Sequence, residues 1–103
     1  MNQVIFNEIQ ALKRKLIPAE KLILFGSQAR GDAREDSDWD LLVLLDKEKR
    51  NFNEDYDKYA YPFVNLEYRY PIKIDVQVHY HKNWESHHSV FKHQIKNEGV
   101  EII

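Results

Sequence analysis

The amino-acid sequence predicts an α+β fold, built on a mixed β-sheet of at least three strands with helices packed on one face. Three stretches, at residues 22–25, 38–45 and 71–80, have the length and apolar pattern of buried strands. Stretches with apolar residues at every third or fourth position precede, separate and follow them, which is the period of an amphipathic helix. The predicted order is α-β-α-β-α-β-α, with residues 1–103 as a single domain.

Residues 3–16 are predicted to form the first helix. Its apolar side chains recur at steps of four, three and four residues, and they are Ile5, Ile9, Leu12 and Leu16. Pro18 marks the end of this helix, because the residue before a proline avoids the helical conformation. The strand at 22–25 follows, and Gly26 gives the backbone the freedom to turn sharply after it.

The second strand is predicted at residues 38–45, after a short helix at 29–31 that Ser27 can cap. Alternation places Asp38, Asp40, Leu42 and Leu44 on one face, with Trp39, Leu41, Val43 and Leu45 on the other. Apart from its first acids the strand is apolar on both faces, which indicates a central position in the sheet. The acids lie at one end of the strand, where a cleft can open.

Residues 51–70 carry Phe52, Tyr56, Tyr59, Phe63, Leu66 and Tyr70 at helical spacing. Pro62 predicts a kink or a split in this helix. The regular aromatic stripe could be a base-stacking surface, but its spacing favours core packing.

The last strand, residues 71–80, alternates strictly and carries Asp75 on its polar face. Asn83 is predicted to cap a final helix that ends at Gly99, and the residues on its apolar stripe are Trp84, His88, Phe91 and Ile95. The apolar residues 100–103 have no partner that the sequence reveals.

Composition restricts the class of protein. The net charge is −2, with 15 basic against 17 acidic residues, and this balance argues against direct nucleic-acid binding. The chain has no cysteine, which excludes disulfides and thiolate metal sites. The longest apolar run, residues 41–45, is far shorter than the roughly 18 residues that span a membrane, and the N-terminus lacks the order of a secretory signal. We expect a cytoplasmic protein with no membrane contact.

Three acids form a candidate metal site. Asp38 and Asp40, two residues apart on a strand, project to the same face and can bind the same pair of divalent ions. Asp75 could converge on the same point, and two metal ions held there suit phosphoryl transfer. The alternative is that all three are solvated surface acids. The position of the first two at the start of a buried strand argues against that alternative.

The Gly26-Ser27 turn offers donors to phosphate groups. Glycine lets the backbone approach phosphate oxygens closely, and Ser27 adds its hydroxyl and its N–H. Arg30, three residues further on, lies on the same side of the short helix and could reach a phosphate. Together with the three acids, this turn indicates a site for a metal-bound nucleoside triphosphate.

The segment GSQARGDAREDSDWDLLV resembles the signature of the minimal nucleotidyltransferases of the DNA polymerase beta-like superfamily. The elements Phe25-Gly26-Ser27, Asp38-Trp39-Asp40-Leu41 and Asp75 match that pattern in order and spacing, although Trp39 is bulkier than the usual aliphatic residue. The resemblance implies the nucleotidyltransferase fold and the transfer of a nucleoside monophosphate to a hydroxyl group. It also implies that two Mg²⁺ ions, or Mn²⁺, are bound by Asp38, Asp40 and Asp75, and that Gly26 and Ser27 hold the β- and γ-phosphates.

The resemblance further implies a donor and a partner. ATP is the expected donor, and the expected acceptor is a HEPN-domain toxin to which AMP is added, so that this chain has an antitoxin role. Two alternatives remain open: a non-catalytic partner-binding subunit on the same fold, and nucleotidylation of a small molecule. A homo-oligomer also remains open.

Five histidines have no assigned role: His79, His81, His87, His88 and His93. By spacing, His79 and His81 share a strand face, so a Zn²⁺ or Ni²⁺ site there is conceivable. The sequence offers no third ligand for it. His79 could instead lie at the rim of the acidic site, since it follows Asp75 on the same face.

Overall fold

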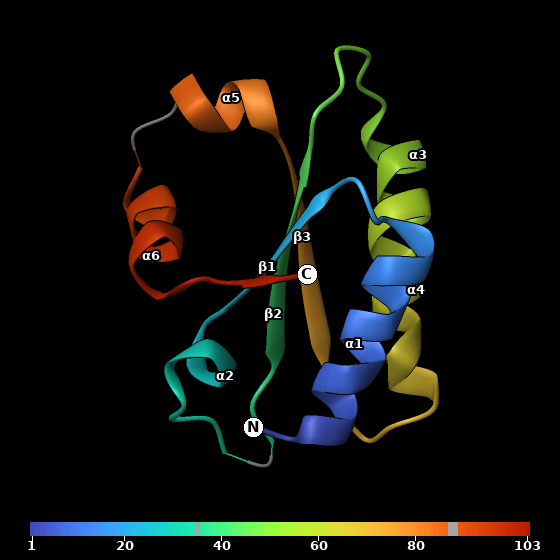
Figure 1. Ribbon diagram of the computed structural model, residues 1–103, viewed down its shortest axis with the longest axis vertical. Helices are drawn as coiled ribbons and strands as arrows, with labels where there is room; N and C mark the ends of the chain where they lie inside the picture. The colour runs from blue at the N-terminus through green and yellow to red at the C-terminus, as the bar shows by residue number, and fades with distance from the viewer. Residues whose placement is uncertain (35, 87–88) are drawn as a thin grey trace.

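The computed structural model describes residues 1–34, 36–86 and 89–103, and within these residues a four-stranded mixed sheet forms the centre of the molecule (Figure 1). The strands are β1 (Lys21–Phe25), β2 (Trp39–Leu45), β3 (Ile74–Tyr80) and β4 (Val100–Ile102). Their order in the sheet is β3-β2-β1-β4. β1 pairs antiparallel with β2 and β4, whereas β2 pairs parallel with β3. The predicted α+β fold with a mixed sheet and a central second strand is confirmed.

Helices surround the sheet, and most are short. They are α1 (Gln3–Leu16), α2 (Ser27–Arg30), α3 (Phe52–Asp55), α4 (Tyr61–Val64), α5 (His81–Ser86) and α6 (Val90–Glu98). A π-helical turn, η1 (Tyr56–Ala60), joins α3 to α4, and a 3-10 turn, η2 (Asn65–Tyr68), follows α4. None of the helices in the described residues is long and apolar enough to cross a membrane.

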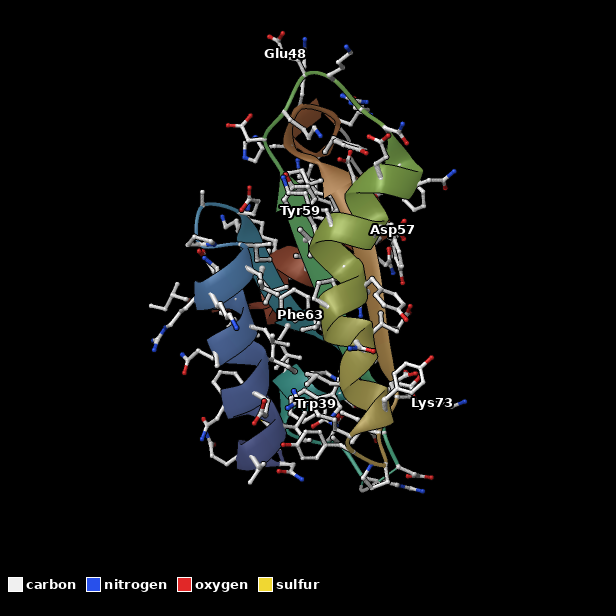
Figure 2. All side chains as sticks on the ribbon, turned by 90° about the vertical axis from the view of Figure 1, so that its right-hand side faces the viewer. Trp39, Glu48, Asp57, Tyr59, Phe63 and Lys73 are labelled. Atoms are coloured by element: carbon white, nitrogen blue, oxygen red, sulfur yellow. The ribbon has the colours of Figure 1, made fainter. Side chains whose placement is uncertain are left out.

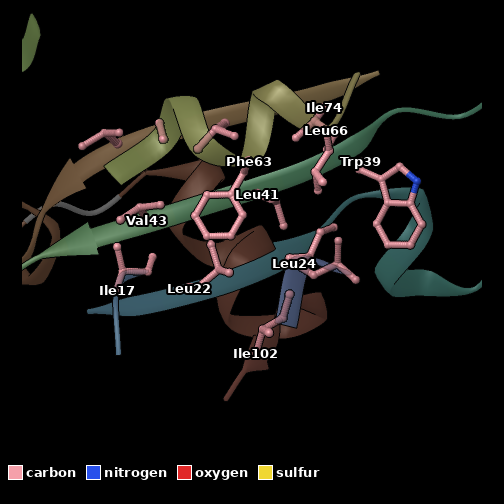
Figure 3. Close-up of a cluster of buried hydrophobic side chains, with 14 of the residues drawn as sticks. Ile17, Leu22, Leu24, Trp39, Leu41, Val43, Phe63, Leu66, Ile74 and Ile102 are labelled. Carbon is pink, nitrogen blue, oxygen red and sulfur yellow. The ribbon is translucent and has the colours of Figure 1, made fainter. Parts of the chain in front are cut away.

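The larger core lies between the sheet, α1 and the helical segment from α3 to η2 (Figure 2). Odd-numbered residues of β2 face it, as the alternation predicts, because Trp39, Leu41, Val43 and Leu45 are all buried there. Phe63 is fully buried and lies over Leu41 in the centre of this core (Figure 3). The aromatic stripe of residues 51–70 is therefore mostly core packing, although Phe52 is 57% exposed.

The segment from α3 to η2 splits where the sequence predicts. Pro62 lacks a backbone N–H, so a regular α-helix could not continue through it without losing a hydrogen bond. The chain passes through the π-helical turn instead, in which the N–H of Tyr61 bonds to the carbonyl of Tyr56, and α4 then begins with Pro62 in its first turn. The segment therefore stays helical from α3 to η2.

Helices also pack on the opposite face of the sheet, which corrects the expectation that they cover one face only. Ile23, Phe25, Leu42 and Leu44 form a second cluster with Ile95 of α6. The Phe91 ring of α6 stands edge-on to Phe25, with ring centroids 5.3 Å apart. Figure 1 shows α6 on the side of the sheet away from α1 and α4. The apolar side chains of β1 and β2 on this face require the second cover, because without it they would be exposed to water.

The single helix predicted from Asn83 to Gly99 is wrong. α5 begins at His81, directly after β3, and α6 begins at Val90. Ser89 caps α6, since its side-chain oxygen accepts a hydrogen bond from the N–H of Lys92 at 3.0 Å. Trp84, Phe91 and Ile95 still pack on the second cluster, and the predicted stripe residue His88 lies outside the described residues.

Residues 100–103, which had no evident partner, supply the edge strand β4. Leu22, Ile23 and Leu24 of β1 pair with Ile102, Glu101 and Val100, respectively. Ile102 is fully buried in the larger core. The ends of three elements differ slightly from the prediction. Asp38 lies one residue before β2, β3 starts at Ile74, and Ile17 rather than Leu16 is buried after α1.

Phe63→Ala is expected to destabilise the protein by about 3–5 kcal/mol, because it removes a fully buried aromatic ring and leaves a cavity that the sheet cannot fill. The free energy of unfolding from urea titration measures this loss. Tyr68→Ala is the matched control, since that ring is 81% exposed. Equal losses in the two variants would contradict the assignment of Phe63 to the core.

A buried carboxylate, Asp55, joins α3 to the sheet. Its side chain accepts hydrogen bonds from Lys47 Nζ at 2.7 Å and from the hydroxyl of Tyr80. Burial alone would raise the pKa of Asp55, but the bonds from Lys47 and Tyr80 outweigh it and lower that pKa. Burial and the same bond with Asp55 raise the pKa of Tyr80 to about 12.

Asp55→Asn is expected to destabilise the protein by about 2 kcal/mol at pH 7, because it removes the charge that Lys47 and Tyr80 compensate. A lowered pKa in the folded state contributes stability above the unfolded pKa of about 3.9 and loses it as the pH falls through the folded-state pKa. The difference between wild type and variant should therefore shrink below about pH 4 in urea titrations. Asp57→Asn, at an exposed position, should show no such difference.

Candidate functional site

Two of the three predicted acids lie side by side on the central strands. Asp40 of β2 and Asp75 of β3 are partners in the parallel register, so their side chains project from the same face of the sheet. That face is the one that α6 covers, because Leu42 follows Asp40 in the alternation and belongs to the second cluster. Asp40 is half-buried, and Asp75 and Asp38 are exposed. The register thus brings Asp40 and Asp75 together, with Asp38 just before β2.

Electrostatic repulsion shows that the three acids interact. Burial raises the pKa of Asp40, and the charges of Asp75 and then Asp38 raise it further. The charge of Arg30 acts in the opposite direction and is the weakest of these contributions. The three acids therefore carry more negative charge than the side chain of Arg30 compensates.

The Gly26 turn packs directly on Asp40. Gly26 has φ 74°, a left-handed conformation that side chains rarely adopt, and it lies between Phe25, the register partner of Asp40, and α2. A Cβ atom built on Gly26 would overlap the carboxylate oxygen Oδ2 of Asp40. Only a glycine therefore allows the main chain to pass this close to the acid.

The structure places the N-cap of α2 at Gly26 instead of the predicted Ser27. α2 begins at Ser27 with Gly26 as its N-cap, so Ser27 is the first residue of the helix and its side chain does not cap it. The Gly26 carbonyl accepts the N–H groups of Ala29 and Arg30 at 3.1 and 3.0 Å. The cap thus lies one residue earlier than expected, and the helix starts at Ser27 rather than at residue 29.

Arg30 has partners that the sequence analysis missed. Its Nη1 lies 3.2 Å from both carboxylate oxygens of Glu98, and its Nε lies 3.3 Å from Asp32. The missed residue, Glu98, comes from the far end of the chain. A pairing of residues 100–103 with the first strand would have placed it near Gly26, but nothing in the local pattern indicates that pairing.

The donors suit Mg²⁺, although they are not assembled around one position. No three His, Cys, Asp or Glu side chains in residues 1–34, 36–86 and 89–103 are close enough to hold a metal ion. Three carboxylates are nevertheless the hard oxygen ligands that Mg²⁺ prefers, and the raised pKa of Asp40 marks the place where a cation is favourable. Asp38 and Asp75 are exposed, so their side chains have room to rotate toward Asp40.

His79 packs in the second cluster. Its ring lies 5.4 Å from the Trp84 ring and 5.8 Å from the Phe91 ring, centroid to centroid, and its Nε2 is 3.2 Å from Gln77 Oε1. In the described part of the chain, neither His79 nor His81 belongs to a group of three or more His, Cys, Asp or Glu side chains that could hold a metal ion. The Zn²⁺ or Ni²⁺ alternative therefore has no support from the geometry.

Comparison with known proteins identifies the family. The family model "Polymerase beta, Nucleotidyltransferase" matches residues 7–103. The chain belongs to this nucleotidyltransferase family. A protein of Methanocaldococcus jannaschii named "Putative protein adenylyltransferase MJ0141" is 34% identical over 91 residues, which are 88% of this chain and 83% of that protein. This nucleotidyltransferase therefore resembles the minimal members of the superfamily, as its signature predicts.

Two solved structures share the nucleotidyltransferase fold. A toxin-antitoxin structure with AMP-PNP superposes with a TM-score of 0.65 at 23% identity, over 100% of this chain and 73% of that chain. A variant of the toxin-antitoxin MntA-HpeT, in which two aspartates two positions apart are replaced by glutamates, superposes with a TM-score of 0.62 at 20% identity. That match covers 95% of this chain and 71% of the other. At these identities the likeness concerns the fold.

Gly26→Ala is expected to destabilise this nucleotidyltransferase by about 2–4 kcal/mol, because it combines a strained φ with a clash against Asp40. Gly31→Ala is the matched control. Gly31 also has a positive φ, of 84°, but a Cβ there would meet no described atom within 4 Å, so only strain of about 1 kcal/mol remains. Urea titration measures both losses. A loss at Gly31 as large as that at Gly26 would show that the Asp40 contact contributes nothing.

Proposed function

We propose that this nucleotidyltransferase transfers AMP from ATP to a hydroxyl group on a protein partner. The observation that carries the proposal is the register of Asp40 with Asp75, with the main chain of Gly26 packed against Asp40. It combines neighbouring carboxylates with a turn whose N–H groups suit phosphate oxygens. The name of the M. jannaschii relative, a protein adenylyltransferase, supports AMP as the group transferred and a protein as the acceptor.

Asp38, Asp40 and Asp75 are proposed as the catalytic acids and as ligands of two Mg²⁺ ions, which Mn²⁺ can replace. When bound, the ions supply the positive charge that the triphosphate and the leaving pyrophosphate need. The excess negative charge around Asp40 supports this role. The MntA-HpeT variant lends further support, because its two replaced aspartates have the spacing of Asp38 and Asp40.

Gly26, Ser27 and Arg30 are proposed to bind the nucleotide. The main chain at Gly26 and the hydroxyl of Ser27 hold the β- and γ-phosphates, and Arg30 reaches a phosphate once it leaves its present carboxylate partners. The toxin-antitoxin structure with AMP-PNP, an ATP analogue, supports ATP as the donor.

The proposed reaction is an in-line displacement at the α-phosphorus. The acceptor oxygen forms a bond to this phosphorus, and the bond from it to the bridging oxygen breaks, so that pyrophosphate leaves with the electron pair. The proton of the acceptor hydroxyl passes to Asp75, whose exposed position leaves it open to an incoming acceptor. Positioning and charge compensation provide the acceleration.

The protein partner is proposed to be a HEPN-domain toxin, for which this chain serves as a cytoplasmic antitoxin. Both structural neighbours are toxin-antitoxin structures, which supports a toxin as the partner. We propose that residues 1–103 act as one nucleotidyltransferase domain and that a partner supplies the acceptor hydroxyl. Direct nucleic-acid binding is not part of the proposal, given the net charge of −2.

Asp40→Asn is expected to reduce AMP transfer at least about 100-fold, since it removes the carboxylate at the centre of the site. The assay incubates the chain with Mg²⁺, α-labelled ATP and a HEPN-domain toxin as the candidate partner, and follows label on that partner. Asp46→Asn is the matched control, because Asp46 is an exposed acid at the opposite end of β2 and should keep wild-type activity.

The assay also separates the alternatives. If label enters a small molecule instead of the partner protein, the acceptor is that molecule and the proposal of a protein acceptor is wrong. Equal label with wild type and with Asp40→Asn would contradict the proposed function. Omission of Mg²⁺ and addition of EDTA should abolish transfer, and label that persists would contradict the proposed metal dependence.

A further inference from the structure

The C-terminal end of α6 lies beside the glycine turn of the proposed nucleotide site. Val100 of β4 is the antiparallel partner of Leu24 in β1. Continuing this register by two residues brings Glu98 level with Gly26. Glu98 is the last residue of α6, and its side chain is 19% exposed. The pairing of β4 with β1 therefore holds a further carboxylate next to the turn.

This carboxylate occupies donors that the nucleotide site is proposed to offer to phosphates. Arg30 Nη1 lies 3.2 Å from each of its two oxygens, and Gln94 Nε2 donates to it at 2.6 Å. The hydrogen bonds from Gln94 and then from Arg30 lower the pKa of Glu98, against its partial burial, which raises it. The groups around Glu98 thus form a small site for an anionic oxygen group.

Helix stability does not explain a glutamate at this position. The carbonyl groups at the end of a helix disfavour a negative charge there. Arg30 also has Asp32 as a second partner at 3.3 Å, so two carboxylates share one guanidinium. The cluster of Arg30, Asp32 and Glu98 has a net charge of −1 by this count, and in this arrangement it opposes the binding of a triphosphate.

We propose that Glu98 is an exchangeable anion in the nucleotide site. It binds Arg30, and a phosphate group of the nucleoside triphosphate replaces it there. The inference rests on the proposed function, because it assumes that these donors bind phosphates. Glu98 competes with any polyphosphate for the same donors, so it weakens the binding of ATP.

The competing explanation gives Glu98 a positioning role. In that role, Glu98 would hold the Arg30 guanidinium in the orientation that a phosphate group needs. Removal of Glu98 would then weaken the binding of ATP. The two explanations predict opposite signs for the same substitution.

The test is the affinity of the full chain for ATP and for inorganic tripolyphosphate with Mg²⁺, measured by isothermal titration calorimetry. Glu98→Gln should bind both about 3- to 10-fold more tightly than wild type, the size expected for removing one partly exposed charge. Glu101→Gln is the matched control. Glu101 lies three residues further on, is 50% exposed and pairs with Lys21 at 3.8 Å, so its loss removes the same charge without touching the site.

A second measurement shows whether Glu98 acts through the phosphate donors. In an Arg30→Gln background the gain from Glu98→Gln should shrink, because the shared donor is absent. In the transfer assay Glu98→Gln should lower KM for ATP and leave kcat within about twofold, as expected for a change in ground-state binding.

Each outcome decides a separate question. If wild type binds neither ATP nor tripolyphosphate and Glu98→Gln does not restore binding, the proposed nucleotide site is wrong and the inference falls with it. If wild type binds them and Glu98→Gln binds equally or more weakly, the nucleotide site stands and the exchange at Glu98 is refuted. Should Glu98→Gln fail to fold, Gln94→Ala removes the 2.6 Å bond that holds Glu98, and it should tighten binding in the same direction.

Discussion

The register of β2 between its neighbours is the constraint on which the rest of the structure depends. β2 is buried on both faces, with Trp39 and Leu41 in the larger core and Leu42 in the second cluster. A shift of one residue would turn every side chain to the opposite face, placing Asp40 in the larger core. Such a shift would bury a charge without a partner, at a cost of several kcal/mol. Apolar packing along β2 therefore places Asp40 opposite Asp75.

The packing that sets the register also holds the acidic side chains in an electrostatically unfavourable arrangement. Asp40 is held near two other carboxylates, and the adjoining Gly26 is held at a positive φ against it. Neither arrangement is stable by itself, and each persists because the strands on either side are fully packed. Repulsion of this kind is relieved by a nearby positive charge, which agrees with the metal-binding role proposed for these acids.

The sequence pattern predicted those parts of the fold that depend on residues close together in the chain. Alternation in β2 is a local property of extended backbone, so the opposite orientations of Trp39 and Asp40 followed from the sequence, as did the split before Pro62. The pairing of β4 with β1 joins residues 22–24 to residues 100–102, which are far apart in the chain, and it leaves no local signal. The contact of Arg30 with Glu98 depends on this pairing. The break between α5 and α6 was missed because the stripe from Trp84 to Ile95 hid the cap at Ser89.

β1 connects the two halves of the site. Through Phe25 it pairs with Asp40 on one side, and through Leu24 it pairs with Val100 on the other, so the Gly26 turn at its end lies between Asp40 and Glu98. Any change in β1 that moved this turn would alter its distance to both carboxylates at once. The three acids and Glu98 are thus coupled through one strand. Under the proposed function, a polyphosphate at the turn brings metal charge to Asp40 while it displaces Glu98 from Arg30.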